Sequence, residues 1–142
     1  VLMIFDFENT VNELVKTPNK QGVELYIKRE DQLHAFVSGN KYRKLKYNLQ
    51  KADNLGFKTL LTFGGAFSNH IAAVASAGEL LGFNTIGIIR GEELQSKVNE
   101  NPTLCFASNC GMKFKFVSRE VYRTKNKNTF LKVLKKEITS SK

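Results

Sequence analysis

Two short segments of the chain combine residue types that could do chemistry. In the first, Ser38–Leu45, the pair Gly39-Asn40 favours a turn, so we expect a helix to begin there. Lys41 then lies in the first helical turn, where the helix dipole disfavours a cation and favours a neutral amine. Such an amine suits a Schiff-base nucleophile. The alternative is a solvated basic helix start, which the spacing taken alone favours.

The second segment runs from Phe63 to His70, where we expect a strand to end, glycines to turn the chain and a helix to begin. The carboxyl end of a parallel strand is where α/β proteins bind ligands. Free amides at the helix start, with the side chains of Ser68 and Asn69, suit a carboxylate or a phosphate. The dinucleotide pattern Gly-x-Gly-x-x-Gly is absent. A capped helix after a glycine turn, without a ligand, remains the alternative.

The other chemically capable residues are isolated. We expect His34 to lie exposed in a loop, and His70 gains interest only from its neighbours. Asp31 could orient a base, but a solvated charge cluster is the simpler interpretation. Cys105 and Cys110 are predicted to be packing residues, because their spacing gives neither a disulfide framework nor a zinc site. No metal site is predicted.

A repeated pattern predicts the elements that position these segments. Three glycines, Gly56, Gly82 and Gly111, each follow an expected helix end and precede a short apolar run. Their spacing fits one βαβ unit each, which predicts an open parallel sheet with right-handed crossovers and flanking helices. The predicted strands are Leu60–Phe63, Ile86–Ile89 and Phe114–Val117, with a further strand at Val23–Lys28. The predicted helices are Asn40–Leu55, Ser68–Leu81 and Asn128–Thr139. Gly78 and its alanine neighbours indicate close packing of the second helix.

Length and composition favour a globular chain. It has 142 residues, with 22 Lys and Arg against 13 Asp and Glu, a formal net charge of +9. Its apolar stretches are shorter than the roughly 20 residues that span a bilayer, and none resembles a signal peptide. We therefore expect a cytoplasmic, reducing location. A first residue Val1 rather than Met suggests a processed or partial chain.

Much of the excess positive charge lies late in the chain. It could form a polyanion site, a solvated face, or a surface that an acidic segment balances. No nucleic-acid motif accompanies it, so we predict neither a nucleic-acid nor a membrane partner. The basic residues concerned are Lys113, Lys115, Arg119, Arg123, Lys125, Lys127, Lys132, Lys135, Lys136 and Lys142.

Three motifs occur in an order that is familiar: Lys28–Asp31, then Ser38–Leu45, then Gly64–His70. Together they resemble the 1-aminocyclopropane-1-carboxylate deaminase/D-cysteine desulfhydrase family over roughly residues 23–117. Members are pyridoxal-phosphate enzymes with a two-domain fold of type II, like the β-subunit of tryptophan synthase. The resemblance implies that residues 1–55 belong to a larger cofactor domain and residues 56–142 form a smaller αβ domain.

The resemblance also implies roles by position. Lys41 matches the catalytic lysine that carries pyridoxal 5′-phosphate, and Asn69 matches the asparagine that bonds the cofactor's ring hydroxyl. Asn40 and Arg43 belong to the lysine motif and are expected to shape the cofactor pocket. Ser68, Asn69 and His70 match the loop that holds the substrate carboxylate, with Ser68 also a catalytic candidate. The implied enzyme is a homodimeric deaminase, lyase or hydrolase that converts a small amino acid to a 2-oxo acid and ammonia.

One feature of the family is missing. Nothing here matches its glycine-rich phosphate cradle, since Gly111 is the only glycine after Gly91. The chain therefore resembles the amino-terminal part of such an enzyme. A non-catalytic truncated lobe that acts as a basic binding module is the alternative function.

Overall fold

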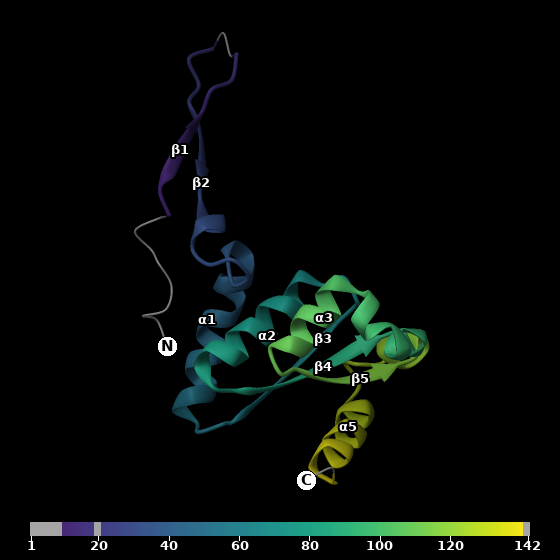
Figure 1. Cartoon of the computed structure of the whole chain (residues 1–142). Helices are drawn as coiled ribbons and strands as arrows, with labels where there is room; N and C mark the ends of the chain where they lie inside the picture. Colours follow the sequence, from purple (N-terminus) through teal and green to yellow (C-terminus); the bar gives the residue numbers. More distant parts are fainter. Residues whose placement is uncertain (1–9, 19–20, 141–142) are drawn as a thin grey trace.

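The computed structural model describes residues 10–18 and 21–140 of the chain. The described part is an α/β body with a separate two-stranded hairpin (Figure 1). The strands are β1 (Asn12–Val15), β2 (Leu25–Lys28), β3 (Thr59–Gly64), β4 (Asn84–Arg90) and β5 (Lys113–Val117). The α-helices are α1 (Gly39–Asn54), α2 (Asn69–Leu81), α3 (Pro102–Asn109), α4 (Arg119–Arg123) and α5 (Asn128–Ser140), and the 3-10 helices are η2 (Glu30–Gln32) and η3 (Glu92–Glu100).

The body is built on a three-stranded parallel sheet in the order β3-β4-β5. Gly64 at the end of β3 pairs with Ile89, and Arg90 at the end of β4 pairs with Val117. The carboxyl ends of all three strands therefore share one edge, as the glycine pattern predicts. Helices α2 and α3 lie on one face of the sheet and α5 lies on the other (Figure 1).

Alternating residues of the sheet supply a core on each face. Ile89 faces the larger cluster, where it joins fully buried Ile71 of α2 and Leu104 of α3. Ile88 faces the smaller cluster, with Leu134 of α5. The amphipathic pattern of residues 128–139 is thus explained by the second face of the sheet.

The three predicted helix-ending glycines are confirmed. Gly56, Gly82 and Gly111 have φ of 71°, 73° and 80°, in the left-handed region that favours glycine. After Gly82, the Phe83 amide donates to the Gly78 carbonyl at 2.9 Å, and the other two helices end with equivalent bonds. Each bond satisfies a carbonyl that the helix end would leave without a partner.

Close packing of α2 on the sheet, predicted from Gly78, is also confirmed. A Cβ atom at Gly78 would lie 2.3 Å from Thr85 Cγ2 and 3.0 Å from the Phe83 carbonyl oxygen. At the other end of the helix, a Cβ at Gly64 would lie 2.4 Å from Ile71 Cγ1. All three distances are shorter than an ordinary van der Waals contact, so the helix and the sheet approach each other closely at these two glycines.

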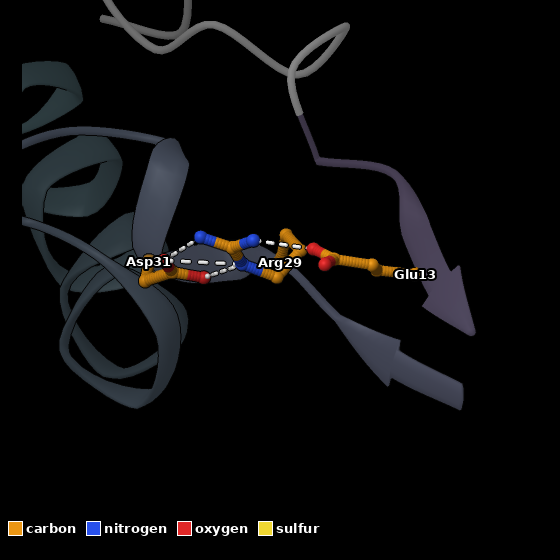
Figure 2. Close-up of polar contacts among 3 residues, drawn as sticks. All are labelled: Glu13, Arg29 and Asp31. Carbon is orange, nitrogen blue, oxygen red and sulfur yellow. Dashed lines mark hydrogen bonds and ion pairs between the residues drawn. The ribbon is translucent and has the colours of Figure 1, made fainter. Parts of the chain in front are cut away.

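The hairpin of β1 and β2 projects away from the sheet (Figure 1). Strand β2 was predicted two residues longer, and β1 was not predicted. Arg29, just after β2, ties the hairpin to η2 by pairing with Glu13 on one side and Asp31 on the other (Figure 2). The Arg29 Nη2–Asp31 Oδ2 distance is 2.9 Å.

Some boundaries differ from the sequence prediction, and several elements, among them α4 (Arg119–Arg123), were not predicted. Helix α2 begins one residue later than expected because Ser68 is its cap. Neither η3 nor the start of α3 was predicted, although the end of α3 at Cys110-Gly111 was. The division at residue 55 stays a prediction, and buried Leu45 and Leu49 before it share a cluster with Ile71 after it.

We predict that Gly78→Ala destabilises the chain. Glycine to alanine inside a helix normally stabilises by about 1 kcal/mol. Here the new methyl group would meet Thr85 and the Phe83 carbonyl, and such overpacking costs about 1–3 kcal/mol. Urea unfolding should therefore show a lower midpoint for Gly78→Ala, whereas Gln50→Ala at an exposed position of α1 should leave it nearly unchanged. A higher midpoint for Gly78→Ala would contradict the close approach.

Candidate functional site

The first turn of α2 lies directly after the carboxyl end of β3. Ser68 caps this helix, and its Oγ accepts hydrogen bonds from the amides of His70 (3.2 Å) and Ile71 (3.4 Å). The Ser68 amide itself donates to the Gly65 carbonyl at 3.1 Å, which closes the glycine turn. The predicted helix start at the ligand-binding edge of the sheet is thus present.

Lys41 lies in the first turn of α1, as predicted, and is half-buried. Its amide donates to the Ser38 carbonyl at 3.1 Å, and Gly39 between them has a φ of 50°. Helix α1 packs against α2 through Leu45 and Leu49. The lysine segment is therefore held on the same helix layer as the Ser68 segment.

The loop before α1 is anchored on two sides. The ring of Phe36 stacks on Phe106 of α3 with centroids 3.8 Å apart. Val37 is fully buried, and its amide and that of Phe36 both donate to His34 Nδ1 at 3.1 Å. His34 is thus half-buried and holds this loop, rather than being exposed as predicted.

The Lys28–Asp31 motif fixes the start of α1 from the hairpin side. Glu30 pairs with Arg43 of α1, and this guanidinium lowers the pKa of the Glu30 carboxyl. The hydrogen bond from Arg29 lowers the pKa of Asp31 in the same way. Asp31 is exposed and belongs to a solvated charge cluster, which confirms the simpler of its two interpretations.

His70 connects the two segments electrostatically. Burial lowers its pKa below the ordinary value of 6.5, and the positive charges of Lys44 and Lys41 lower it further. Lys41 and Lys44 lie on α1 and His70 lies on α2, so the field of one segment acts on a side chain of the other. The imidazole is therefore mainly neutral at pH 7 and able to donate or accept a hydrogen bond.

The side chains at this edge form an amine, an amide, a hydroxyl and an imidazole. Asn69 in the first turn of α2 and Asn40 in the first turn of α1 are both exposed and so accessible to a ligand. Ser68 is half-buried and Lys41 likewise. This donor set can hold a carboxylate and present an amine to a carbonyl compound. The roles of Lys41, Asn40, Ser68, Asn69 and His70 stay predictions.

The cysteines show no sign of activation. Both thiols are free and half-buried. Burial, with a contribution from Glu79, raises the pKa of the Cys110 thiol to about 11, so it is a poor nucleophile at neutral pH. Within residues 10–18 and 21–140, no group of three or more His, Cys, Asp or Glu side chains could hold a metal ion.

Arg90 was missed by the sequence interpretation. It ends β4, beside the glycine turn, and a Cβ at Gly65 would lie 3.9 Å from its Nη2. The only signal in the sequence is a cation at the carboxyl end of a predicted strand. The residues that lie beside Arg90 depend on the register of β3 and β4, and no local sequence pattern predicts that register.

Comparison with known proteins identifies the relatives of this chain. A provisionally assigned 1-aminocyclopropane-1-carboxylate deaminase of Pyrococcus abyssi is 34% identical over 93 residues, 66% of this chain and 28% of that protein. The mitochondrial bifunctional D-cysteine desulfhydrase/1-aminocyclopropane-1-carboxylate deaminase of Arabidopsis thaliana is 32% identical over 121 residues, 82% of this chain and 30% of that protein. The chain is homologous to this deaminase/desulfhydrase family. No protein-family model matches it.

Solved structures agree with this assignment. The crystal structure of a 1-aminocyclopropane-1-carboxylate deaminase homologue superposes with a TM-score of 0.59 at 30% identity, over 76% of this chain and 32% of the other. A hydrogen sulfide-producing enzyme of Fusobacterium nucleatum shares the fold at 13% identity and a TM-score of 0.57. The chain spans less than a third of the length of the two named relatives above. Of the described helices, none is long and apolar enough to cross a membrane.

We predict that Lys44→Gln raises the pKa of His70. Removing one of the two cations that oppose imidazole protonation should move the His70 titration toward 6.5 in an NMR pH series. Lys58→Gln is the matched control, because Lys58 precedes β3 at the opposite edge of the sheet. An unchanged His70 titration in Lys44→Gln would show that α1 and α2 do not share a field.

The same shift sets a direction for stability. The pKa of His70 is lower in the folded chain than in the unfolded one, so the unfolded chain binds more protons between the two values. The contribution of His70 to the free energy of unfolding is therefore fully present above the pKa that it has in the unfolded chain. It is lost as the pH falls below that value and through the lower pKa of the folded chain. In His70→Gln, the free energy of unfolding measured with urea should therefore change less with pH in this range.

Proposed function

We propose that the chain is the amino-terminal part of a pyridoxal-phosphate-dependent deaminase or desulfhydrase that acts on a small amino acid. The observation that carries the proposal is the shared field of the Lys41 segment and the Ser68–His70 segment, in a chain homologous to enzymes of these names. The relatives' activities favour lyase chemistry rather than the hydrolase class. The chain's own activity, its substrate and a homodimeric state belong to the proposal.

The donor set fits one end of pyridoxal phosphate. The Lys41 amine would carry the cofactor aldehyde, and the exposed Asn69 amide would bond its ring hydroxyl, with Asn40 beside the lysine. A glycine-rich phosphate cradle is absent from residues 10–18 and 21–140, so another part of the longer protein would hold the phosphate. When bound, the cofactor supplies an electron sink that weakens the bonds at the substrate α-carbon.

The chain's own residues would orient the substrate and move protons. The Ser68 oxygen accepts from the His70 and Ile71 amides, and its hydroxyl proton would be the group that donates to a substrate carboxylate at the start of α2. His70 is mainly neutral at pH 7, so its imidazole can accept a hydrogen bond without repelling the Lys41 ammonium. The Lys41 amine would be the group of this chain that takes a proton from the substrate.

A second candidate function rests on charge. The net charge of +9 supports the alternative of a basic binding module without catalysis. The two functions differ in what they ask of Lys41, because a binding module needs only its charge. A cytoplasmic location also stays a proposal, and the Arabidopsis relative is a mitochondrial protein.

Reductive trapping separates the two functions. The chain is incubated with pyridoxal phosphate, reduced with borohydride and mapped by peptide mass spectrometry. We expect the adduct on Lys41 to exceed that on Lys44, which lies on the same helix and is more exposed. Asn69→Ala should lower the Lys41 adduct and leave the Lys44 adduct unchanged. Adducts spread over exposed lysines, with Lys41 no higher than Lys44, would favour the binding module.

A further inference from the structure

Two cationic side chains share one aromatic ring at the carboxyl edge of the sheet. The guanidinium carbon of Arg90 lies 5.9 Å from the centroid of the Tyr122 ring, and Lys125 Nζ lies 4.8 Å from the same centroid. Tyr122 belongs to α4 and packs edge-on against Phe63 of β3, with centroids 6.3 Å apart. The ring thus packs against the core; Arg90 is exposed and Lys125 is half-buried.

In residues 10–18 and 21–140, neither Arg90 nor Lys125 has an acidic partner. Within the described part of the chain, no carboxylate lies within ion-pair distance of Arg90 or Lys125. Arg29, Arg43 and Arg119, by contrast, each pair with a Glu or Asp. Of the arginines in the described part of the chain, Arg123 also forms no ion pair. Glu93, three residues after Arg90, pairs with Arg119 instead, at 2.8 Å.

Gly65 leaves space beside the Arg90 guanidinium. Its φ is not in the left-handed region, so its backbone does not require glycine. A Cβ atom there would meet only Arg90 Nη2 within 4 Å, at an ordinary distance of 3.9 Å, so packing does not require glycine either. A glycine at position 65 is explained if a ligand group approaches Arg90 at this point, because a residue without a side chain leaves room for it.

The polar end of Tyr122 can take part as a donor. Burial raises the pKa of its phenol, while the charge of Arg90 lowers it, and the net shift is upward. The hydroxyl therefore stays protonated across the physiological range. The guanidinium of Arg90 and the ammonium of Lys125 both lie within 6 Å of the centre of this ring, so Tyr122 joins two hydrogen-bond donors of positive charge.

We infer that Arg90, Tyr122 and Lys125 form an oxyanion subsite beside Gly65, which takes a carboxylate or phosphate group of a small ligand. A guanidinium binds such groups through two parallel hydrogen bonds, which a lysine cannot do alone. The subsite lies at the carboxyl ends of β3 and β4, the edge at which α/β sheets bind ligands. The inference does not depend on the proposed lyase chemistry, because it requires only that an anion binds at this edge.

Titration of the full chain with inorganic phosphate, and separately with malonate, tests the subsite. Binding is followed by the NMR shifts of the Gly65 amide and the Arg90 Nε–H group at constant ionic strength. We expect saturable shifts with at least one anion, and the tighter anion identifies phosphate or carboxylate as the group bound. Arg90→Gln should weaken binding about tenfold, since a hydrogen bond to a charged group is lost. Lys125→Gln should weaken it less.

The matched control is Lys113→Gln, an exposed lysine at the amino end of β5 and therefore at the opposite edge of the sheet. It removes the same charge and should leave phosphate and malonate binding unchanged. The inference is overturned if Arg90→Gln binds both anions as the unaltered chain does. It is also overturned if Lys113→Gln loses as much affinity, or if the shifts never saturate.

Discussion

Helix α2 lies so close to the sheet that two positions between them have no room for a side chain. Gly78 faces Thr85 of β4, and Gly64 at the end of β3 faces Ile71. These contacts lie near opposite ends of the helix, so they fix both its distance from the sheet and its tilt. The first turn of α2, capped by Ser68, is consequently held at the carboxyl end of β3.

The positions of the other candidate groups follow from this contact. Helix α1 packs on α2, and the stacked Phe36 and the Glu30–Arg43 pair fix the loop and the hairpin that precede it. The positive charge of Lys41 therefore lies close enough to His70 to lower the pKa of its imidazole. On the other side of the glycine turn, the register of β4 places Arg90 beside Gly65. The Lys41 amine thus acts electrostatically on the His70 imidazole, and the Arg90 guanidinium lies beside the glycine turn that leads into the helix of His70.

The sequence was informative where local chemistry decides the structure. The left-handed glycines mark helix ends, and the β-rich runs after them mark buried strands, so β3, β4 and β5 were predictable. Helix α3 has a usable signal that was not applied: Asn101 caps it, accepting from the Leu104 amide at 3.0 Å, and Pro102 is its first residue. Strand β1 has four residues and is exposed along most of its length, so no buried face patterns it. The place of Arg90 depends on strand pairing, which no local pattern encodes.

The central claim is that the Lys41 segment and the Ser68–His70 segment share one edge of the sheet. Paramagnetic relaxation measures this most directly, with a nitroxide on Lys41→Cys after replacement of Cys105 and Cys110 by serine. The account predicts strong broadening of the amides of residues 68–71 and little effect on the amides of Asn84 and Lys113, at the amino ends of β4 and β5. Equal or stronger broadening at Asn84 and Lys113 would contradict it.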